Sequence, residues 1–177
     1  MRVKITMKVR ALSQKNEALN GKESNGMKIA NIHSEPLKPE WCDYYGHLNE
    51  AFYLLVFSNA TFELQNILGI GEDYYNRTGR SIYTLESHIR YLQEVRGTVI
   101  MSVDSIVLGV DQKRIRVGHV MKVNNIERAT AECMLLHFDV KLKRAVTIPE
   151  DILSRLKKLK VADAPEWAGR SIRDIGH

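Results

Sequence analysis

The spacing of hydrophobic residues changes once along this chain, from a helical period to an alternating one. Between Glu50 and Leu68 there is no glycine or proline, and apolar residues recur at steps of three and four. This pattern predicts one long helix over that range. Its main stripe consists of Tyr53, Phe57, Ala60, Leu64 and Ile67, while Phe52, Leu55, Val56 and Phe62 lie off the stripe. We therefore expect a helix that is buried on more than one side.

Residues at both ends of this helix support the prediction. Asn49 is a preferred N-cap residue, and Glu50 complements the positive end of the helix dipole. Gly69 is a typical stop. Before the helix, residues 27–39 predict a short strand that two prolines end.

Beyond residue 80 the apolar positions alternate, which is the period of β-strands. Four strands are predicted within residues 81–93, 98–108, 113–123 and 128–142, joined by short hairpin turns. In the first strand, strict alternation predicts one face with Tyr83, Leu85, Ile89 and Tyr91, and an opposite face with Glu86, His88 and Arg90. Residues 149–160 predict a short amphipathic helix.

The order of strand, long helix and antiparallel meander predicts an α+β domain whose sheet curls around one helix. Because that helix is apolar on two sides, the sheet can cover only one of them. A second copy of the chain is the simplest cover for the other side, so we expect a homodimer. The predicted organisation is a basic leader over residues 1–26, one domain over 27–160 and a tail over 161–177.

The net charge of +5 suggests a nucleic-acid partner at first, but the excess lies at one end of the chain. Residues 1–28 carry seven basic and two acidic side chains, whereas the remaining chain carries nineteen of each. A neutral body argues against nucleic-acid binding, and no apolar run approaches the ~20 residues of a membrane span. Two cysteines cannot form a disulfide framework. We therefore expect a cytoplasmic protein with no nucleic-acid or membrane partner.

Candidate chemistry lies in the stretch WCDYYGHLNEAFY, residues 41–53, immediately before and at the start of the long helix. Read structurally, Asp43 is a turn residue, Gly46 supplies a positive φ, Asn49 caps the helix and His47 packs nearby. Read functionally, Asp43 can fold back toward the helix N-terminus, where backbone N–H groups are free donors. A carboxylate beside such donors suits acyl transfer, and a thioester is a suitable substrate. Cys42 is a weaker candidate nucleophile, because a neighbouring acid disfavours the thiolate.

The pattern D-x-x-G-H-x-N, formed by Asp43, Gly46, His47 and Asn49 before a long helix and four strands, resembles the hotdog-fold acyl-CoA thioesterases of the 4-hydroxybenzoyl-CoA thioesterase type. The resemblance covers residues 27–156. It implies a five-stranded antiparallel sheet around the helix, dimers or tetramers, and active sites shared across the dimer interface. It also implies that Asp43 is the catalytic carboxylate, as nucleophile or as general base. N–H groups from Gly46 to Asn49 would polarise the carbonyl, with His47 and Asn49 as substrate contacts or loop organisers.

Within that family, the segments WCDYYGHLN, TLESHIRYLQEV, LGVDQKRI and ATAECMLLHFD are similar to thioesterases found with carnitine dehydrogenase, whose proposed substrate is betainyl-CoA. A quaternary ammonium group is bound by aromatic faces. Candidate substrate-binding aromatics near Asp43 are Trp41, Tyr44, Tyr45, Phe52 and Tyr53. Glu86 is a candidate negative charge for the same group. Ordinary packing of a loop on a helix and a solvated strand face are the alternative interpretations.

Lys113, Arg114 and Arg116 are candidates to bind the phosphates of coenzyme A at the protein surface, although charged runs are often merely solvated. His119 and His137 are expected to be structural, and the six histidines form no metal-ligand pattern. We expect no cofactor, since coenzyme A is part of the substrate. The alternatives are an acyl-carrier-protein thioesterase, a hotdog hydratase, and a non-catalytic acyl-CoA-binding protein or regulator. The acidic Asp43 favours catalysis over binding alone.

Overall fold

The computed structural model describes residues 28–172, so the basic leader predicted over residues 1–26 lies outside the described residues. The strands are β1 (Ile29–Pro36), β2 (Arg80–Tyr91), β3 (Ile100–Val110), β4 (Arg114–Val123), β5 (Ile126–Asp139) and β6 (Arg144–Ala145). The helices are η1 (Pro39–Trp41), α2 (Glu50–Leu68), α3 (Glu72–Thr78) and α4 (Glu150–Leu159). This is the α+β element order that the hydrophobic pattern predicts.

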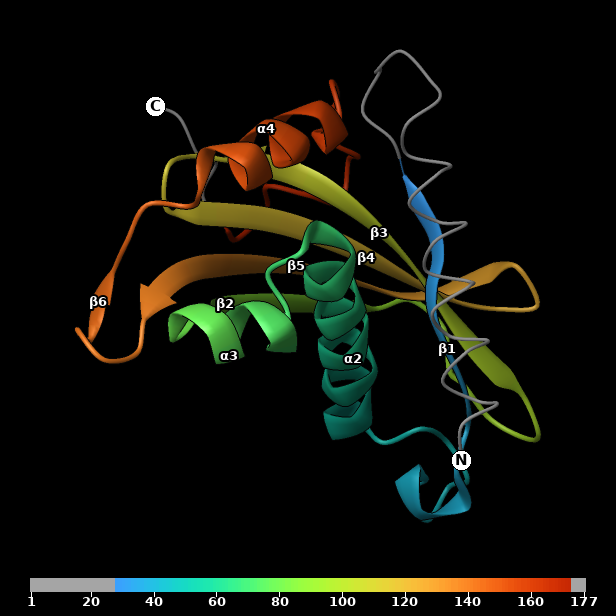
Figure 1. The fold of residues 1–177 in the computed structure, drawn as a ribbon. Helices are drawn as coiled ribbons and strands as arrows, with labels where there is room; N and C mark the ends of the chain where they lie inside the picture. The colour runs from blue at the N-terminus through green and yellow to red at the C-terminus, as the bar shows by residue number, and fades with distance from the viewer. Residues whose placement is uncertain (1–27, 173–177) are drawn as a thin grey trace, which may run out of the picture.

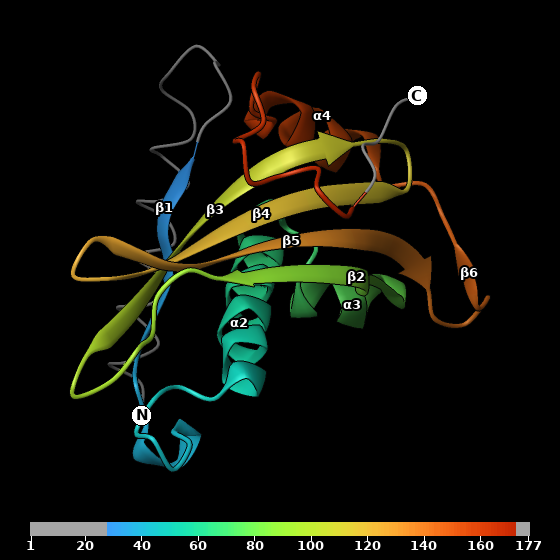
Figure 2. The same ribbon diagram turned by 180° about the vertical axis from the view of Figure 1, so that it is seen from behind.

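One antiparallel sheet curves around α2 (Figures 1 and 2). Its strand order is β1-β3-β4-β5-β2, and the two-residue β6 pairs with β5. Therefore β1 and β2 are the edge strands of the five-stranded path. The hairpins β3–β4 and β4–β5 form as the alternating pattern predicts, and β2 joins the sheet on the far side of β5.

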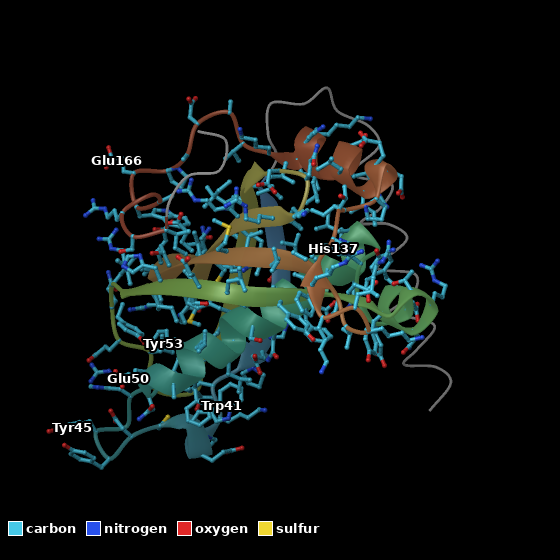
Figure 3. The ribbon with its side chains drawn as sticks, turned by 90° about the vertical axis from the view of Figure 1, so that its left-hand side faces the viewer. Trp41, Tyr45, Glu50, Tyr53, His137 and Glu166 are labelled. Atoms are coloured by element: carbon cyan, nitrogen blue, oxygen red, sulfur yellow. The ribbon has the colours of Figure 1, made fainter. Side chains whose placement is uncertain are left out.

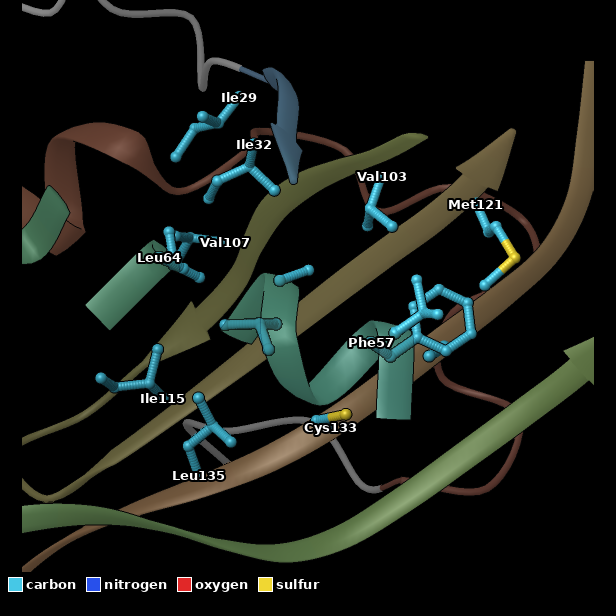
Figure 4. Close-up of a cluster of buried hydrophobic side chains, with 14 of the residues drawn as sticks. Ile29, Ile32, Phe57, Leu64, Val103, Val107, Ile115, Met121, Cys133 and Leu135 are labelled. Atoms are coloured by element: carbon cyan, nitrogen blue, oxygen red, sulfur yellow. The ribbon is translucent and has the colours of Figure 1, made fainter. Parts of the chain in front are cut away.

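The concave face of the sheet and the buried side of α2 form the hydrophobic core (Figure 4). The helix contributes Val56, Phe57, Ala60 and Leu64, all at most 1% exposed. Inward positions on β3, β4 and β5 meet them, including Val103, Val107, Ile115, Val117, Met121, Cys133 and Leu135. Burying these side chains is the main favourable term in folding, at roughly 1.5–3 kcal/mol for each large apolar side chain.

Both ends of α2 are fixed by the residues that the sequence identifies. Asn49 has an extended backbone, and its side chain accepts a hydrogen bond from the N–H of Ala51. Gly69 adopts the left-handed conformation with φ 76°, which a glycine reaches without the steric cost of a Cβ. These caps hold the N-terminus of α2 in a defined place beside the preceding loop.

The faces of β2 differ from the prediction because a bulge interrupts its period. Thr84 pairs with Leu135 and Glu86 pairs with Met134, so Leu85 is an extra residue in the ladder. The bulge reverses the parity of the strand. As a result, Tyr83 lies on the opposite face from Ile89 and Tyr91, not on the same face.

The helix α3 was also not predicted, because its seven residues lie between two glycines in a segment without a clear apolar period.

Two buried histidines hold structural hydrogen bonds, as expected. His119 is fully buried beneath Phe57, and its ring nitrogens contact Thr61 Oγ1 at 3.0 Å and Ser105 Oγ at 2.7 Å. Burial lowers its pKa from the usual 6.5 to about 4. His137 Nε2 contacts the hydroxyl of Tyr74 at 2.9 Å. Both imidazoles are therefore parts of the folded core.

Residues 161–172, the described part of the predicted tail, cross the convex face of the sheet (Figure 2). There Arg116 forms an ion pair with Glu132, and both side chains are at most 3% exposed. The second carboxylate oxygen of Glu132 accepts the N–H of Gly169 at 2.9 Å. A Cβ built on Gly118 would lie 2.6 Å from the ring of Trp167. The tail therefore packs closely on the sheet and seals a buried ion pair.

Candidate active site

The loop before α2 folds back on itself as a tight hairpin. Cys42 and Leu48 form an antiparallel bridge, the N–H of Asp43 donates to His47 O at 2.9 Å, and the N–H of Asn49 donates to Trp41 O at 2.9 Å. Gly46, with φ 79°, forms the reversal at the tip. A further hydrogen bond, from the N–H of Leu48 to Val95 O at 2.8 Å, connects the hairpin to the segment that leads into β3.

Asp43 organises this hairpin with one oxygen of its carboxylate. Oδ1 accepts the N–H of Tyr45 at 2.9 Å and the N–H of His47 at 3.1 Å. Within residues 28–172, no group donates a hydrogen bond to Oδ2, and the carboxylate forms no salt bridge. The side chain is half-buried. One oxygen is therefore fixed and the other remains available for chemistry.

Two other aspartates cap turns in the same way but differ at the second oxygen. Asp111 Oδ1 accepts the N–H groups of Lys113 and Arg114, and the Arg114 guanidinium binds Oδ2 at 2.6 Å. Burial opposes ionisation of Asp111, but these donors outweigh burial and lower its pKa. In Asp139, the N–H of Leu142 and the Arg80 guanidinium lower the pKa. Asp43 differs from both because no arginine neutralises its free oxygen.

The backbone donors of the loop are not those that the sequence predicted. The N–H groups of Gly46, His47, Leu48 and Asn49 all donate within the chain, to Asp43 O, Asp43 Oδ1, Val95 O and Trp41 O. The expectation that these groups are free to polarise a carbonyl is wrong in this conformation. In the first turn of α2, the N–H groups of Ala51 and Phe52 donate to Asn49. Within the described chain, the N–H of Glu50 meets no acceptor, so it is the free donor at the helix N-terminus.

His47 and Asn49 act as organisers of the loop. His47 is half-buried, and its Nε2 lies 3.2 Å from Glu94 Oε2. Glu94 Oε1 in turn lies 3.2 Å from Arg96 Nε. The Asn49 side chain is occupied as the helix cap. A substrate contact from either residue stays a prediction.

The aromatic residues near Asp43 separate into distinct groups. Trp41 stacks on Phe52 with ring centroids 5.3 Å apart, and Lys38 Nζ lies 4.2 Å from the Trp41 ring centroid. Tyr44 and Tyr45 lie at the exposed tip of the hairpin, with centroids 4.0 Å apart. Figure 3 shows Tyr45 projecting away from the body of the domain. These four side chains therefore form no common cage within one chain.

Tyr53 belongs to a third group that includes a residue the sequence analysis did not select. Its ring meets the ring of Tyr91 edge to face, with centroids 5.0 Å apart. Tyr91 ends β2 and is exposed, and Glu94 follows in the segment that binds the hairpin. Strict alternation placed Tyr91 on the same strand face as Tyr83, so the separate position of Tyr91 was not predicted. The signal in the sequence that could have identified Tyr91 as a site residue was its place at the end of a predicted strand.

The predicted coenzyme A residues lie far from Asp43 in the same chain. The hairpin contacts the segment before β3, whereas Lys113 and Arg114 follow the other end of β3, roughly 30 Å away at ~3.3 Å per residue. They line a depression of about 460 Å³ together with Asp111, Gln112 and Leu136. Arg116 is not at the surface as predicted, because the tail covers it and Glu132 pairs with it. Glu86 lies after the bulge in β2, also away from the hairpin.

Two other kinds of site, a cysteine nucleophile and a metal centre, find little support among the described residues. The thiol of Cys42 points to Lys38 O, with a sulfur–oxygen distance of 3.7 Å. Residues 28–172 contain no group of three or more histidine, cysteine or acidic side chains placed to hold a metal ion. Over the same range, no helix has the length and apolar character needed to cross a membrane. The arrangement that remains is the Asp43 carboxylate, with one oxygen uncommitted, in the hairpin that leads into α2.

Comparison with known proteins shows the family of this chain. Residues 37–156 match the family model described as the thioesterase-like superfamily. The chain belongs to this family. A thioesterase-like relative from Pseudomonas aeruginosa, betainyl-CoA thioesterase, is 36% identical over 151 residues, which are 82% of this chain and 95% of that protein. A relative from Agrobacterium fabrum, L-carnitine dehydrogenase/betainyl-CoA thioesterase, is 36% identical over 171 residues. The match covers 94% of this chain but only 35% of that protein.

Solved structures place the thioesterase-like chain in the hotdog fold. A candidate thioesterase from Pseudomonas putida has a TM-score of 0.68 and 32% identity, covering 84% of this chain and 98% of that one. A Staphylococcus aureus protein solved in complex with CoA has a TM-score of 0.73 at 22% identity, with the same coverage. The curled antiparallel sheet around α2 is therefore the hotdog fold that the sequence motif implied.

Proposed function

We propose that this protein is an acyl-CoA thioesterase and that Asp43 supplies its catalytic carboxylate. The observation that carries the proposal is the state of Asp43, whose Oδ1 is held by two N–H groups while Oδ2 is uncommitted. The free N–H of Glu50 at the start of α2 would polarise the thioester carbonyl. The family relationship supports thioester hydrolysis as the reaction class.

Two mechanisms fit this arrangement. As general base, Oδ2 takes a proton from water while the water oxygen bonds to the carbonyl carbon; the oxyanion then expels the CoA thiolate, which receives the proton from Asp43. As nucleophile, Oδ2 bonds to the carbonyl carbon and the C–S bond breaks, and water then hydrolyses the mixed anhydride. Either path needs one free oxygen on a fixed carboxylate. Neither requires a cofactor beyond the coenzyme A of the substrate.

For the acyl group, we propose a small cationic acid such as betaine. The relatives from Pseudomonas aeruginosa and Agrobacterium fabrum are named for betainyl-CoA. The hairpin and the segments beside it also present carboxylates and aromatic rings. Quaternary ammonium groups are bound by such surfaces.

We propose that two copies of the chain assemble to complete the site. In the described sheet, β2 pairs only with β5 and leaves one edge unpaired, with Tyr83 and Leu85 exposed on it. Leu54, Leu55 and Phe62 are also exposed on α2, at 40–57%. Light scattering coupled to gel filtration should give the mass of a dimer or larger assembly, and a monomer at micromolar concentration would contradict this part of the proposal.

Antiparallel pairing of two β2 edges would also explain the distant basic residues. The hairpin lies near the Tyr91 end of β2, and the Lys113 turn lies toward the Arg80 end. In an antiparallel pair these ends meet across the two copies. Lys113 and Arg114 of one copy could then meet the phosphates of a coenzyme A bound at the hairpin of the other.

The test is free-thiol release from betainyl-CoA, 4-hydroxybenzoyl-CoA and short and medium aliphatic acyl-CoAs. Wild-type protein should cleave at least one ester, and Asp43→Asn should be slower by about 10²–10⁴-fold. Acyl-carrier-protein esters belong in the same panel, because preference for them would favour a carrier-protein thioesterase. Binding of acyl-CoA without hydrolysis would contradict the proposal and favour a non-catalytic module.

A further inference from the structure

The rings of Tyr53 and Tyr91 form a small aromatic wall beside the helix N-terminus. Tyr53 lies in the first turn of α2, and Tyr91 is the last residue of β2. Their centroids are 5.0 Å apart at an interplanar angle of 82°. Tyr53 is 4% exposed and Tyr91 is 53% exposed. The first ring is therefore fixed by the core, while the second is open on one side.

Glu50 places a negative charge next to this wall. It precedes Tyr53 by three residues, so both side chains share one face of the helix (Figure 3). Burial, and after it the Glu50 carboxylate, raise the pKa of the Tyr91 hydroxyl. Within residues 28–172, Glu50 forms no salt bridge. Its charge is therefore uncompensated within the described chain.

Two other charged side chains lie around Tyr53, and they differ: the acid Glu94 is paired, whereas Arg128 donates to neutral oxygens. Glu94 lies between His47 and Arg96, at 3.2 Å from each. Arg128 Nη1 donates to Gln93 Oε1 at 2.8 Å and to Glu94 O at 3.3 Å, which directs the guanidinium to this segment. Glu50 is thus the acidic side chain that remains for a ligand.

The position of Glu50 makes the charge of the acyl group important. Its N–H is the free donor proposed for the oxyanion, and its carboxylate belongs to the same residue. An unpaired carboxylate raises the energy of a nearby oxyanion when the acyl group is neutral. A cationic acyl group would offset that charge and would also gain contact with aromatic faces.

We propose that Tyr53, Tyr91 and Glu50 form the acyl-binding pocket and select a quaternary-ammonium acyl group over a neutral one of the same shape. The proposal rests on the thioesterase function proposed above. It moves the cation site away from Trp41 and Tyr44, where the sequence pattern had placed it. It adds Tyr91 and the Glu50 side chain as specificity residues, with no part in bond breaking.

A pair of isosteric substrates tests this selection. Betainyl-CoA and 3,3-dimethylbutanoyl-CoA differ in the central atom of the terminal group, which is a cationic nitrogen in one and a neutral carbon in the other. Glu50→Gln should lower kcat/KM for the cationic ester about 10-fold and raise it for the neutral ester. Tyr91→Leu should lower the ratio of cationic to neutral kcat/KM about 10-fold, whereas Tyr91→Phe should keep that ratio.

Matched controls separate local from general effects. Glu63→Gln removes a carboxylate from the same helix, about 20 Å along its axis from Glu50 at 1.5 Å per residue. Tyr75→Leu removes an exposed ring from α3, which has no part in the proposed pocket. Both controls should keep the wild-type ratio of cationic to neutral kcat/KM.

The outcomes distinguish the two proposals. If wild type cleaves neither ester nor any other acyl-CoA, the thioesterase function fails and the pocket fails with it. If wild type cleaves both esters but the ratio is unchanged in Glu50→Gln and Tyr91→Leu, the pocket assignment is overturned and the thioesterase function stands. A loss of selectivity in Glu86→Gln with none in Glu50→Gln would move the cation site to β2.

Discussion

The Asp43 hairpin and the Asp111 turn lie near opposite ends of the sheet and use the same local device. In each, one carboxylate oxygen accepts two backbone N–H groups from residues that follow closely in the sequence. They differ in the second oxygen, which Arg114 neutralises at Asp111 and which is uncommitted at Asp43. The same type of turn therefore has both carboxylate oxygens occupied at Asp111 and leaves one uncommitted at Asp43.

The wider pattern of charges strengthens this contrast. Asp139 is paired with Arg80, Glu132 with Arg116, and Asp104 with Lys28 and Lys122. These pairs are what burial of charge requires. Around Asp43 the balance is different, because Asp43 and Glu50 both lack a basic partner within residues 28–172.

The largest expected effect comes from breaking the sealed pair on the convex face. Glu132→Ala removes the buried carboxylate that pairs with Arg116 and that accepts the Gly169 N–H. We expect the free energy of unfolding to fall by about 3–5 kcal/mol. Urea unfolding measures it, with Glu127→Ala on the exposed part of the same strand as control. A change below that of the control would show that the pair contributes nothing to stability.

The next effect is a loss of stability in acid caused by His119. Its folded pKa of about 4 lies below the ordinary 6.5, so the unfolded chain binds the proton first as pH falls. The stabilisation is complete above pH 6.5 and is lost as pH falls toward 4, with a loss of about 2 kcal/mol by pH 5. Urea unfolding at pH 7 and pH 5 should show this loss in wild type and a smaller one in His119→Gln. Equal losses in both would exclude His119 as the cause.

A smaller effect is expected from straining the backbone of the Asp43 hairpin. Gly46 has φ 79°, and a Cβ there would meet no atom within 4 Å, so Gly46→Ala introduces backbone strain without a clash. The strain should cost about 1 kcal/mol and should lower turnover by loosening the Asp43 geometry. Gly97→Ala, also at positive φ with open space, is the matched control for stability. Wild-type turnover in Gly46→Ala would argue against a role for the hairpin geometry.

The smallest effect concerns coenzyme A at the other end of the sheet. Arg114→Ala should raise KM for acyl-CoA esters severalfold, about 1 kcal/mol in binding for one exposed charge contact. KM for the truncated N-acetylcysteamine thioester, which lacks the nucleotide, should not rise in parallel. A parallel rise for both esters would mean that Arg114 acts through Asp111 and the fold rather than through phosphate.

The sequence predicts most of this fold because its strongest signals are local. The limits of α2 follow from Asn49 and Gly69, and the inward positions of β3 and β4 follow from alternation. The change in which face of β2 its side chains occupy, at Leu85, could not be predicted, because a bulge depends on the register with β5. The burial of Arg116 depends on a tail without a hydrophobic period.

The same distinction applies to the candidate site. The position of Asp43 in a turn before the helix was predictable from residue types and spacing. Which N–H groups remain free was not, because the hairpin pairs its own backbone and Val95 takes the N–H of Leu48. The aromatic residues are close in sequence, yet Lys38 covers the Trp41 ring and Tyr91 comes from another strand.

The most direct test of the account compares Asp43→Asn with Asp139→Asn on the best acyl-CoA substrate. An asparagine keeps one oxygen that can accept the turn N–H bonds at each site and removes the negative charge, so loop geometry and chemistry are separated. Turnover should fall about 10²–10⁴-fold in Asp43→Asn and stay at the wild-type level in Asp139→Asn. Equal turnover in the two variants would contradict the assignment of Asp43 as the catalytic carboxylate.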